Sequence, residues 1–396
     1  ITPYFFSLEF RLKNAYQKGD PHPFNPNWTL NSYGYDEALR LGAERIGWSS
    51  RAPAGSSPGV RKRGIGVGTQ GIWVSGCMGF PDIYEHTGAI IKLNRDGSAD
   101  ISSGTVDIGS GQIATLCQIA AAELGVGMDK VRMVYADTDT VPFDAPTHAS
   151  RGTYSSGLAV KAAAAQVRKR VFEIAAGLME ANPDDLDISN GQVYVKGSPD
   201  SARALTDIIH IAESPFIMDT EQGPRPSSPP EHKGTIIGSS SLAPPENPSP
   251  ATALFVEVEV DTETGQVAVL RCVYAHDLGR LINPNAAQGQ VEGGMQQGIG
   301  YALMENLVFD PDTGACLSAD FLDYKMPTAV EMPRVIESIF IETNEPTGPF
   351  GAKSLSEQCV TVPAAAIAAA VYNAIGVRIR DLPITPEKIL NALGKL

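Results

Sequence analysis

The sequence is poor in positive charge and in cysteine. Against 45 acidic residues it has 31 lysines and arginines, which gives a formal net charge of −14. Such a chain repels the phosphates of nucleic acids and of anionic membranes, so we expect neither as a partner. The five cysteines are scattered and none forms a CxxC pair, which argues against a zinc or iron–sulfur site in this chain. Their odd number suits free buried thiols in a reducing compartment.

Long apolar runs and targeting signals are missing as well. No run of 18 apolar residues occurs, so we predict no transmembrane span. The first residues show no signal-peptide pattern, and we therefore expect a cytoplasmic protein. The 396 residues are enough for two or more domains with their own cores.

Common catalytic and nucleotide-binding motifs are absent too. There is no G-x-S-x-G elbow. The loop GSGQ at 109–112 lacks the Gly-Lys-Ser/Thr of a Walker A motif, and GIGVG at 64–68 has the wrong spacing for a dinucleotide fingerprint. A nucleotide-binding module is therefore poorly supported. His148 and His276 have no histidine or cysteine at ligand spacing, so we favour hydrogen-bonding or structural roles for them over metal binding or base catalysis.

The sequence does contain an alternation of strand pairs and helices. The dipeptides Asp-Gly at 96–97 and Asn-Gly at 190–191 predict tight hairpins, and a longer hairpin is predicted over 253–277. Apolar periodicity predicts helices over 7–20, 35–48, 112–126, 156–180 and 362–376. This alternation is typical of the α+β class.

Composition divides the chain into four parts. Residues 1–60 look like a helical N-terminal connection, and 61–212 like a first α+β subdomain. Residues 213–250 contain nine prolines and several serines, which predicts a long irregular connection. Residues 251–396 form a second α+β subdomain in this interpretation.

Glycine-rich and small-residue stretches are the candidates for binding a ligand. Glycines at 109–112 precede a predicted helix, where backbone N–H groups can approach an anion. Residues 289–306 are interpreted as a second glycine-and-glutamine loop that leads into a helix. These two loops either close over one bound group from two sides or are ordinary turns between strand and helix. The stretch THASRGTYSSG at 147–157 either leaves room for a bulky ligand or is a helix cap with a surface loop.

Taken together, these motifs resemble the molybdenum-binding subunit of the xanthine dehydrogenase and aldehyde oxidoreductase family, the molybdenum hydroxylases. The resemblance is carried, in the order of the family, by TVDIGSGQ, APTHASRGTYSSG, DLGRLINPNAAQGQVEGGMQQGIGYALMEN, GPFGAKSLSE and RDLPITPEKIL. It implies the second molybdopterin-binding domain of that subunit, with two α+β subdomains that enclose the cofactor. The first molybdopterin domain is absent here, so a further chain would have to supply it.

The resemblance also implies the site residues, which lie on four separate stretches of the chain. Those toward the pterin are Gly109, Ser110, Gly111, Gln112 and Gln290. Those beside the molybdenum are Ala149, Ser150, Arg151 and Gly152. Lys353 is counted with the cofactor-binding residues and would hold the loop that carries the catalytic residue, Glu357. No side chain is expected to bind the metal, because the dithiolene of the pterin holds it in this family.

In the implied reaction, an N-heterocycle, a purine or an aldehyde is hydroxylated with oxygen from water, and Glu357 accepts a proton. A carboxylate removed from water binds a proton more readily, which suits this role near neutral pH. The cofactor would be molybdopterin in its cytosine dinucleotide form, and electrons would pass to iron–sulfur clusters and FAD on partner chains. The alternatives are an aromatic acyl-CoA reductase of the same family, similar to 4-hydroxybenzoyl-CoA reductase, and a non-catalytic structural subunit. From its position alone, Glu357 could simply complement a helix dipole.

Two departures from the family pattern bear on these alternatives. The pterin loop usually reads Gly-Gln-Gly, whereas here Ser110 takes the central place and Gln112 follows later. Serine is shorter than glutamine and reaches less far. Before the glutamate the family usually has Val-Gly, whereas this chain has Leu355 and Ser356. We expect the serine Cβ to tighten that turn and its hydroxyl to be able to bond the carboxylate of Glu357.

Overall fold

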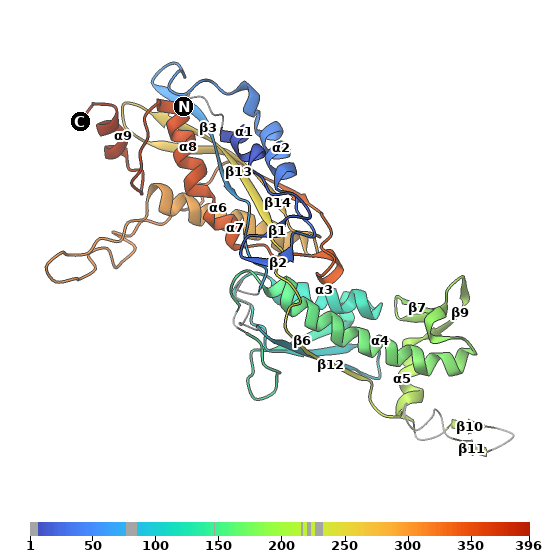
Figure 1. The fold of residues 1–396 in the computed structure, drawn as a ribbon. Coiled ribbons are helices and arrows are strands. Elements are labelled where there is room, and N and C mark those ends of the chain that lie inside the picture. Colours follow the sequence, from blue (N-terminus) through green and yellow to red (C-terminus); the bar gives the residue numbers. More distant parts are fainter. Residues whose placement is uncertain (1–6, 77–84, 146, 215–216, 220–222, 226–232) are drawn as a thin grey trace. The chain divides into compact units, whose positions relative to one another are not determined.

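The computed structural model describes residues 7–76, 85–145, 147–214, 217–219, 223–225 and 233–396 (Figure 1). The chain forms two compact units. Unit 1 consists of Ile1–Val74, Pro248–Pro346 and Lys353–Leu396, and unit 2 consists of Ser75–Asn247 and Thr347–Ala352. Mixed sheets and helices in both units confirm the α+β class.

The helices are α1 (Ser7–Lys13), α2 (Tyr35–Ile46), α3 (Gln112–Leu124), α4 (Gly157–Met179), α5 (Leu205–Glu213), α6 (Pro284–Leu303), α7 (Glu357–Thr361), α8 (Pro363–Ile375) and α9 (Pro386–Ala392). The strands are β1 (Pro21–His22), β2 (Asn25–Thr29), β3 (Arg61–Gln70), β4 (Thr87–Leu93), β5 (Ala99–Ser103), β6 (Val131–Tyr135), β7 (Leu186–Ser189), β8 (Gln192–Val195), β9 (Ser198–Ala204), β10 (Ile217–Asp219), β11 (Gly223–Arg225), β12 (Ile237–Leu242), β13 (Ala251–Asp261), β14 (Val267–Asp277) and β15 (Val335–Ile341). The three predicted hairpins are confirmed as β4–β5, β7–β8 and β13–β14, and the five predicted helices as α1 (shorter than predicted), α2, α3, α4 and α8.

Unit 1 is built on a four-stranded sheet in the order β15-β14-β13-β3, covered by helices on both faces. Strand β13 alternates between the two faces, as the two-residue period of a strand requires. Leu254 and Val256 lie in one apolar cluster with residues of α6 and α8. Ala253 and Phe255 lie in the other cluster, with residues of α2. Because both faces are covered, this stretch of β13 reads as continuously apolar.

The glycines of GIGVG allow α8 to lie directly on β3. A Cβ added to Gly64 or Gly66 would come within 2.2 Å of the carbonyl oxygen of Ala370 or Ala366. A Cβ at Gly68 would meet the carbonyl oxygen of Val362 at the same distance. This glycine series is therefore a packing motif, which agrees with its failure to match a dinucleotide fingerprint.

Helix α8 is also part of a segment that is apolar enough to be considered as a membrane span. Residues Glu357–Ile375 are long and apolar enough to cross a bilayer by length and composition alone, but 61% of their most apolar window is buried inside the structure. The contact with β3 and the apolar cluster of unit 1 account for this composition as that of a core helix.

Unit 2 is built on a second four-stranded sheet, in the order β12-β4-β5-β6. Helix α4 lies close to its β12 edge, since a Cβ at Gly238 would come within 2.2 Å of the carbonyl oxygen of Ala163. The small sheet β7-β8-β9 belongs to the same unit. The loop between β5 and α3 and the turn before α4 carry the two predicted binding stretches of this unit.

The structure differs from the sequence interpretation at three places. Strand β3 belongs to the predicted first subdomain at 61–212, but it pairs with β13 of the predicted second subdomain at 251–396. The two compact units therefore combine residues of several predicted parts and do not follow them in chain order. The predicted irregular connection 213–250 contains β12, whose sequence IGSSSL becomes a strand only by pairing with β4. The stretch 289–306, predicted as a glycine-rich loop that leads into a helix, does contain a helix, but the loop at its start is wrong. Helix α6 already begins at Pro284, where the side chain of Asn283 accepts the N–H of Ala286.

Candidate functional site

The predicted site residues divide between the two units. Those at 109–112 and 149–152 belong to unit 2, and Gln290, Lys353 and Glu357 belong to unit 1. In unit 2 the structure brings the two predicted stretches together. The side chain of Gln112 lies against Gly152, where an added Cβ would come within 2.2 Å of Gln112 Oε1. Glycine is thus required at this position for the glutamine to keep its place.

The loop before α3 is fixed by a residue that the sequence interpretation missed. Asp107 Oδ1 accepts the backbone N–H groups of Gly109 at 2.9 Å and Gly111 at 3.2 Å. The two glycines adopt φ values of 101° and 70°, which other residues rarely adopt. An aspartate two residues before a glycine is a known turn signal, so the sequence could have indicated this role.

Two polar atoms in this loop are buried without a partner. Ser110 Oγ and Gln112 Nε2 have no hydrogen-bond partner among the described residues. Gln112 is only 6% exposed. A buried hydroxyl or amide N–H without an acceptor is costly, and native proteins rarely leave one unmatched. The pyran and pyrimidine atoms and the phosphate of a pterin cofactor offer such acceptors, so these residues fit the group that the sequence implied.

The stretch from Ala149 to Gly152 has a strained backbone. Ala149 and Ser150 are consecutive non-glycine residues with φ of 50° and 55°. Residues held in this region cost free energy and occur often at ligand-binding sites, because the surrounding structure must hold them there. The strain marks this turn as a candidate binding segment independently of its sequence.

Arg151 anchors that turn with its side chain. Its guanidinium is 1% exposed and donates to Asp144 Oδ1 at 2.9 Å, and its Nε lies 3.3 Å from Glu85 Oε2. Glu85 Oε1 in turn contacts His148 Nε2 at 2.8 Å. Because two carboxylates of unit 2 engage the guanidinium, we assign Arg151 to positioning the turn. Glu85 and Asp144 were not found from the sequence, since isolated acids carry no readable motif.

In unit 1, Gln290 lies beside the segment that carries Glu357. Ser356 Oγ donates to Gln290 Oε1 at 2.7 Å, and Ser356 N donates to Gln358 Oε1 at 3.2 Å. The serine hydroxyl therefore has an acceptor other than the glutamate carboxylate that the sequence suggested. Glu357 is partly exposed and is the first residue of α7.

Ser356 also has an unusual backbone conformation. Its φ of 154° and ψ of −68° lie in a region that favours glycine. This observation explains why the family usually has glycine at this place. In this chain Ser356 adopts the strained conformation, and its hydroxyl donates a hydrogen bond to Gln290.

Substitutions at Ser356 are expected to separate these two effects. Ser356→Ala keeps the strain and loses the bond, so the free energy of unfolding should fall by about 1 kcal/mol. Ser356→Gly also loses the bond but relieves the strain, so it should be more stable than the alanine variant by about 1 kcal/mol. Urea denaturation of both variants measures the difference. If the glycine variant is no more stable than the alanine variant, the backbone of residue 356 is not strained.

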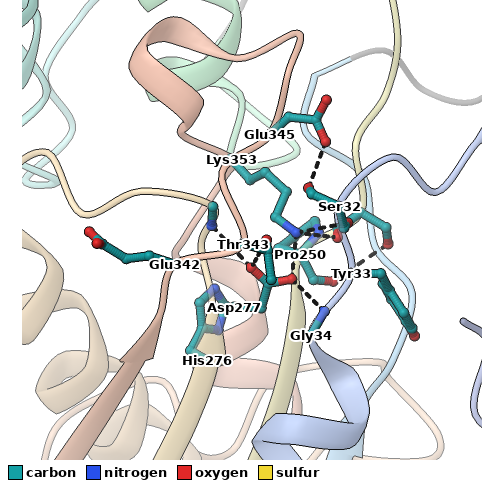
Figure 2. Close-up of polar contacts among 12 residues, drawn as sticks. Ser32, Tyr33, Gly34, Pro250, His276, Asp277, Glu342, Thr343, Glu345 and Lys353 are labelled. Carbon is teal, nitrogen blue, oxygen red and sulfur yellow. Dashed lines mark hydrogen bonds and ion pairs between the residues drawn. The ribbon is translucent and has the colours of Figure 1, made fainter. Parts of the chain in front are cut away.

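Lys353 lies four residues before Glu357, at the centre of a buried polar cluster (Figure 2). Its Nζ bonds the carboxylate of Asp277 and donates to the carbonyl oxygens of Ser32 at 3.1 Å and Ser249 at 3.2 Å. An ammonium group has three donors, and these three acceptors use them all. We therefore assign Lys353 to positioning the segment rather than to direct contact with a cofactor.

Asp277 connects this cluster to three further elements. Its carboxylate accepts the N–H of Gly34 at 2.9 Å, the N–H of Gly279 at 3.1 Å and the hydroxyl of Thr343 at 2.7 Å. Both charged side chains of the pair are fully buried. Burial lowers the pKa of Lys353, and the neighbouring Asp277 opposes that shift. The cluster holds together the start of α2, the end of β14 and the segment before α7.

His276 adjoins the cluster and is completely buried. Burial lowers its pKa from 6.5 to about 4, although Asp277 opposes this shift and Lys353 adds to it. The ring contacts Thr252 Oγ1 and the carbonyl oxygen of Ser354, which confirms a hydrogen-bonding role.

This depressed pKa predicts a loss of stability in acid. Between pH 6.5 and 4 the unfolded chain binds a proton that the folded chain excludes, so stability falls as the pH falls through this window. The contribution of His276 between pH 7 and 5 is about 2 kcal/mol. Urea denaturation at both pH values measures the free energy of unfolding. Between pH 7 and 5 this free energy should fall by about 2 kcal/mol less in His276→Gln than in the wild-type protein. An equal fall in both proteins would contradict the lowered pKa of His276.

An α+β fold in which the loop before α3 holds two buried polar atoms without a partner among the described residues fits a protein that binds a pterin cofactor. The family model described as molybdopterin cofactor-binding domain matches residues 41–333, and the chain belongs to this family.

Relatives of known name agree with this family. The chain is 33% identical over 388 residues to the xanthine dehydrogenase molybdenum-binding subunit of Escherichia coli O157:H7, covering 96% of this chain and 49% of that protein. It is 30% identical to the aldehyde oxidoreductase molybdenum-binding subunit PaoC of E. coli K12, covering 98% and 48%. The crystal structure of quinoline 2-oxidoreductase from Pseudomonas putida 86 matches with a TM-score of 0.84 and 26% identity, covering 98% and 49%. The chain thus spans about half the length of these relatives.

Proposed function

We propose that this chain is the C-terminal half of the molybdopterin-binding subunit of a molybdenum hydroxylase. The observation that carries this proposal is the pair of buried, partnerless polar atoms, Ser110 Oγ and Gln112 Nε2, in a chain of a pterin-binding family. The substrate class is an N-heterocycle, a purine or an aldehyde. The names of the relatives, which include xanthine dehydrogenase, aldehyde oxidoreductase and quinoline 2-oxidoreductase, support this range.

The residues of this chain have distinct roles in the proposed site. Ser110 and Gln112 would donate hydrogen bonds to the pterin, and the backbone of Gly109 and Gly111 would allow its close approach. The turn from Ala149 to Gly152 would line the molybdenum. Gln290 would bond the pterin or its phosphate. When bound, the cofactor supplies the two-electron redox chemistry that adds an oxygen from water to an electron-poor carbon.

Glu357 is the proposed general base. It accepts a proton at its carboxylate, while the bonds of Ser356 to Gln290 and of Lys353 to Asp277 hold the segment just before it in place. A positioned carboxylate of this kind contributes about 10²–10⁴-fold to a rate.

The remaining components lie outside this chain. We propose the cytosine dinucleotide form of molybdopterin, an iron–sulfur subunit and an FAD subunit as electron acceptors, and a cytoplasmic location. The relative named 6-hydroxypseudooxynicotine dehydrogenase complex subunit gamma supports a multi-subunit arrangement.

Metal analysis of the purified complex tests this proposal. We expect molybdenum at near-stoichiometric amounts with the wild-type chain, and a large loss of molybdenum and pterin with Gln112→Leu, because the amide donor is gone. Gln192→Leu, at an exposed position of unit 2, is the control and should retain both. If the complex contains all its chains but no molybdenum, the proposal that this chain belongs to an active molybdenum hydroxylase is refuted. The alternative of a non-catalytic structural subunit would then be favoured.

A further inference from the structure

Gln358 directly follows Glu357, the proposed general base, and its side chain is completely buried. Its amide bonds backward across Glu357, because Gln358 Oε1 accepts the backbone N–H of Ser356 at 3.2 Å. This bond closes a small ring in which Glu357 is the central residue. The place of the Glu357 backbone therefore depends on the amide of Gln358.

The backbone of Ser356 requires support of this kind. Its φ of 154° and ψ of −68° are unfavourable for serine and persist only where the surrounding structure holds them. A serine before a helix usually caps the helix with its hydroxyl, but Ser356 makes no capping bond in the described part of the chain. Its hydroxyl donates to Gln290 and its carbonyl oxygen accepts the N–H of Cys359 at 2.9 Å. The bond to Gln358 holds its third polar group, the N–H.

Helix α7 is itself anchored on two neighbouring elements of unit 1. Gly294 of α6 lies so close to it that an added Cβ would come within 2.6 Å of Cys359 Cβ. The hydroxyl of Tyr274, in β14, donates to the carbonyl oxygen of Cys359 at 2.6 Å. Helix α7 is thus a fixed support from which the amide of Gln358 can act.

The amide of Gln358 is costly for the stability of the fold. Because the N–H of Ser356 can only donate, the amide atom that faces it is the oxygen, and Nε2 is left without this contact. Nε2 is buried and has no hydrogen-bond partner among the residues that the structure describes. A buried donor without an acceptor costs at least as much free energy as one hydrogen bond contributes. The effect of Gln358 on the backbone before Glu357 therefore explains this side chain better than stability does.

We infer that Gln358 is a positioning residue of the proposed reaction. Its amide fixes the backbone of Ser356 and thereby the place of the Glu357 carboxylate. The inference rests on the proposed function, because it requires that Glu357 accepts a proton from the reacting groups. It adds a residue that acts through Glu357 and does not itself contact substrate or cofactor.

Hydrogen exchange in the purified complex tests the structural part of this inference. Gln358→Met keeps the length of the side chain and removes the acceptor of the Ser356 N–H. Exchange at Ser356, followed by mass spectrometry of a peptide that spans 353–361, should become about fivefold faster, the factor that one lost hydrogen bond gives. Gln296→Met is the matched control. It removes a bond from α6 to the carbonyl oxygen of Pro327 and should leave this peptide unchanged. Equal exchange in Gln358→Met and in the wild-type protein would overturn the inference.

Kinetics on the same complexes test the functional part. Gln358→Met should lower kcat per bound molybdenum by about 10- to 100-fold with little change in KM, because a displacement of about 1 Å has effects of this size. Added to Glu357→Gln, it should cause no further loss, because Gln358 acts through that carboxylate. If Gln358→Met lowers only the molybdenum content and the resistance to urea, its role is structural and the inference is overturned. A further loss on top of Glu357→Gln would show direct contact with substrate or cofactor and would also overturn it.

A second variant covers the case in which Gln358→Met does not fold. Gln358→Asn keeps an amide but is one methylene shorter, so its oxygen falls short of Ser356 N and the same results are expected. If neither variant assembles into the complex, Gln358 is required for the fold as a whole and the positioning role is overturned.

The proposed function and this inference fail in different ways. Turnover retained in Glu357→Gln refutes the proposed base, and the inference with it. Turnover lost in Glu357→Gln but retained in Gln358→Met refutes the inference alone.

Discussion

Replacing Glu357 with glutamine is expected to lower turnover by about 10²–10⁴-fold, the usual contribution of a general base. Glutamine has nearly the same shape but cannot accept a proton at neutral pH. The bonds that fix the adjacent residues, from Ser356 to Gln290 and from Lys353 to Asp277, do not involve the carboxylate. The cofactor should therefore bind as before, and molybdenum content should be unchanged.

The assay uses the purified complex, an artificial electron acceptor, and whichever aldehyde, purine or N-heterocycle the wild-type enzyme oxidises. Glu387→Gln, at an exposed position of α9 in the same unit, is the matched control and should retain full activity. Turnover retained by the Glu357 variant would rule out the base assignment, while turnover lost together with molybdenum would show a structural role instead.

Replacing Lys353 with methionine is expected to lower the free energy of unfolding by about 3–5 kcal/mol, the usual cost of breaking a buried ion pair. The substitution leaves the carboxylate of Asp277 buried without its cation, because both side chains are inaccessible to solvent. It also removes the donors to the carbonyl oxygens of Ser32 and Ser249. Urea denaturation of the purified chain measures the loss.

A double-mutant cycle identifies the buried charge as the cause. Asp277→Asn added to Lys353→Met neutralises the stranded carboxylate, so the double variant should lose less stability than the sum of the single variants. Lys388→Met is the control. Among the residues that the structure describes, its ammonium donates to the carbonyl oxygens of Asp381 and Pro383 and pairs with no carboxylate, so its loss should be small. Additive losses at Lys353 and Asp277 would contradict a coupled pair.

Local sequence patterns predicted most helices and hairpins correctly because each depends on nearby residues. The turns at 96–97 and 190–191 contain Gly with Asp or Asn, and the apolar period of α2 and α3 is evident in the sequence. Strand β12 was missed because IGSSSL has a low strand propensity and is stabilised by β4, which is distant in sequence. The start of α6 was missed because its many glycines disfavour a helix. Two of them, Gly294 and Gly298, instead give room to Cys359 and Pro363.

The candidate site was predicted from the sequence only in part. The loop at 109–112 and the turn at 149–152 were recognised by their composition and by their resemblance to a family, and the structure brings Gln112 against Gly152. Glu85 and Asp144 act through single carboxylates that engage Arg151 and, for Glu85, His148. A single acidic residue gives no pattern, so these two supports could not be found before the chain was folded, whereas Asp107 stands two residues before Gly109 and could have been recognised as a turn residue.

The sequence by itself determined the α+β class, the family and the identity of the residues at each candidate position, because these depend on local periodicity and on short motifs. The tertiary structure decided what each residue bonds to. It assigned the ammonium of Lys353 to a buried carboxylate, the guanidinium of Arg151 to Glu85 and Asp144, and the hydroxyl of Ser356 to Gln290. These pairings join residues that are mostly far apart in the chain, and the need to satisfy buried polar groups selects them only once the backbone is in place.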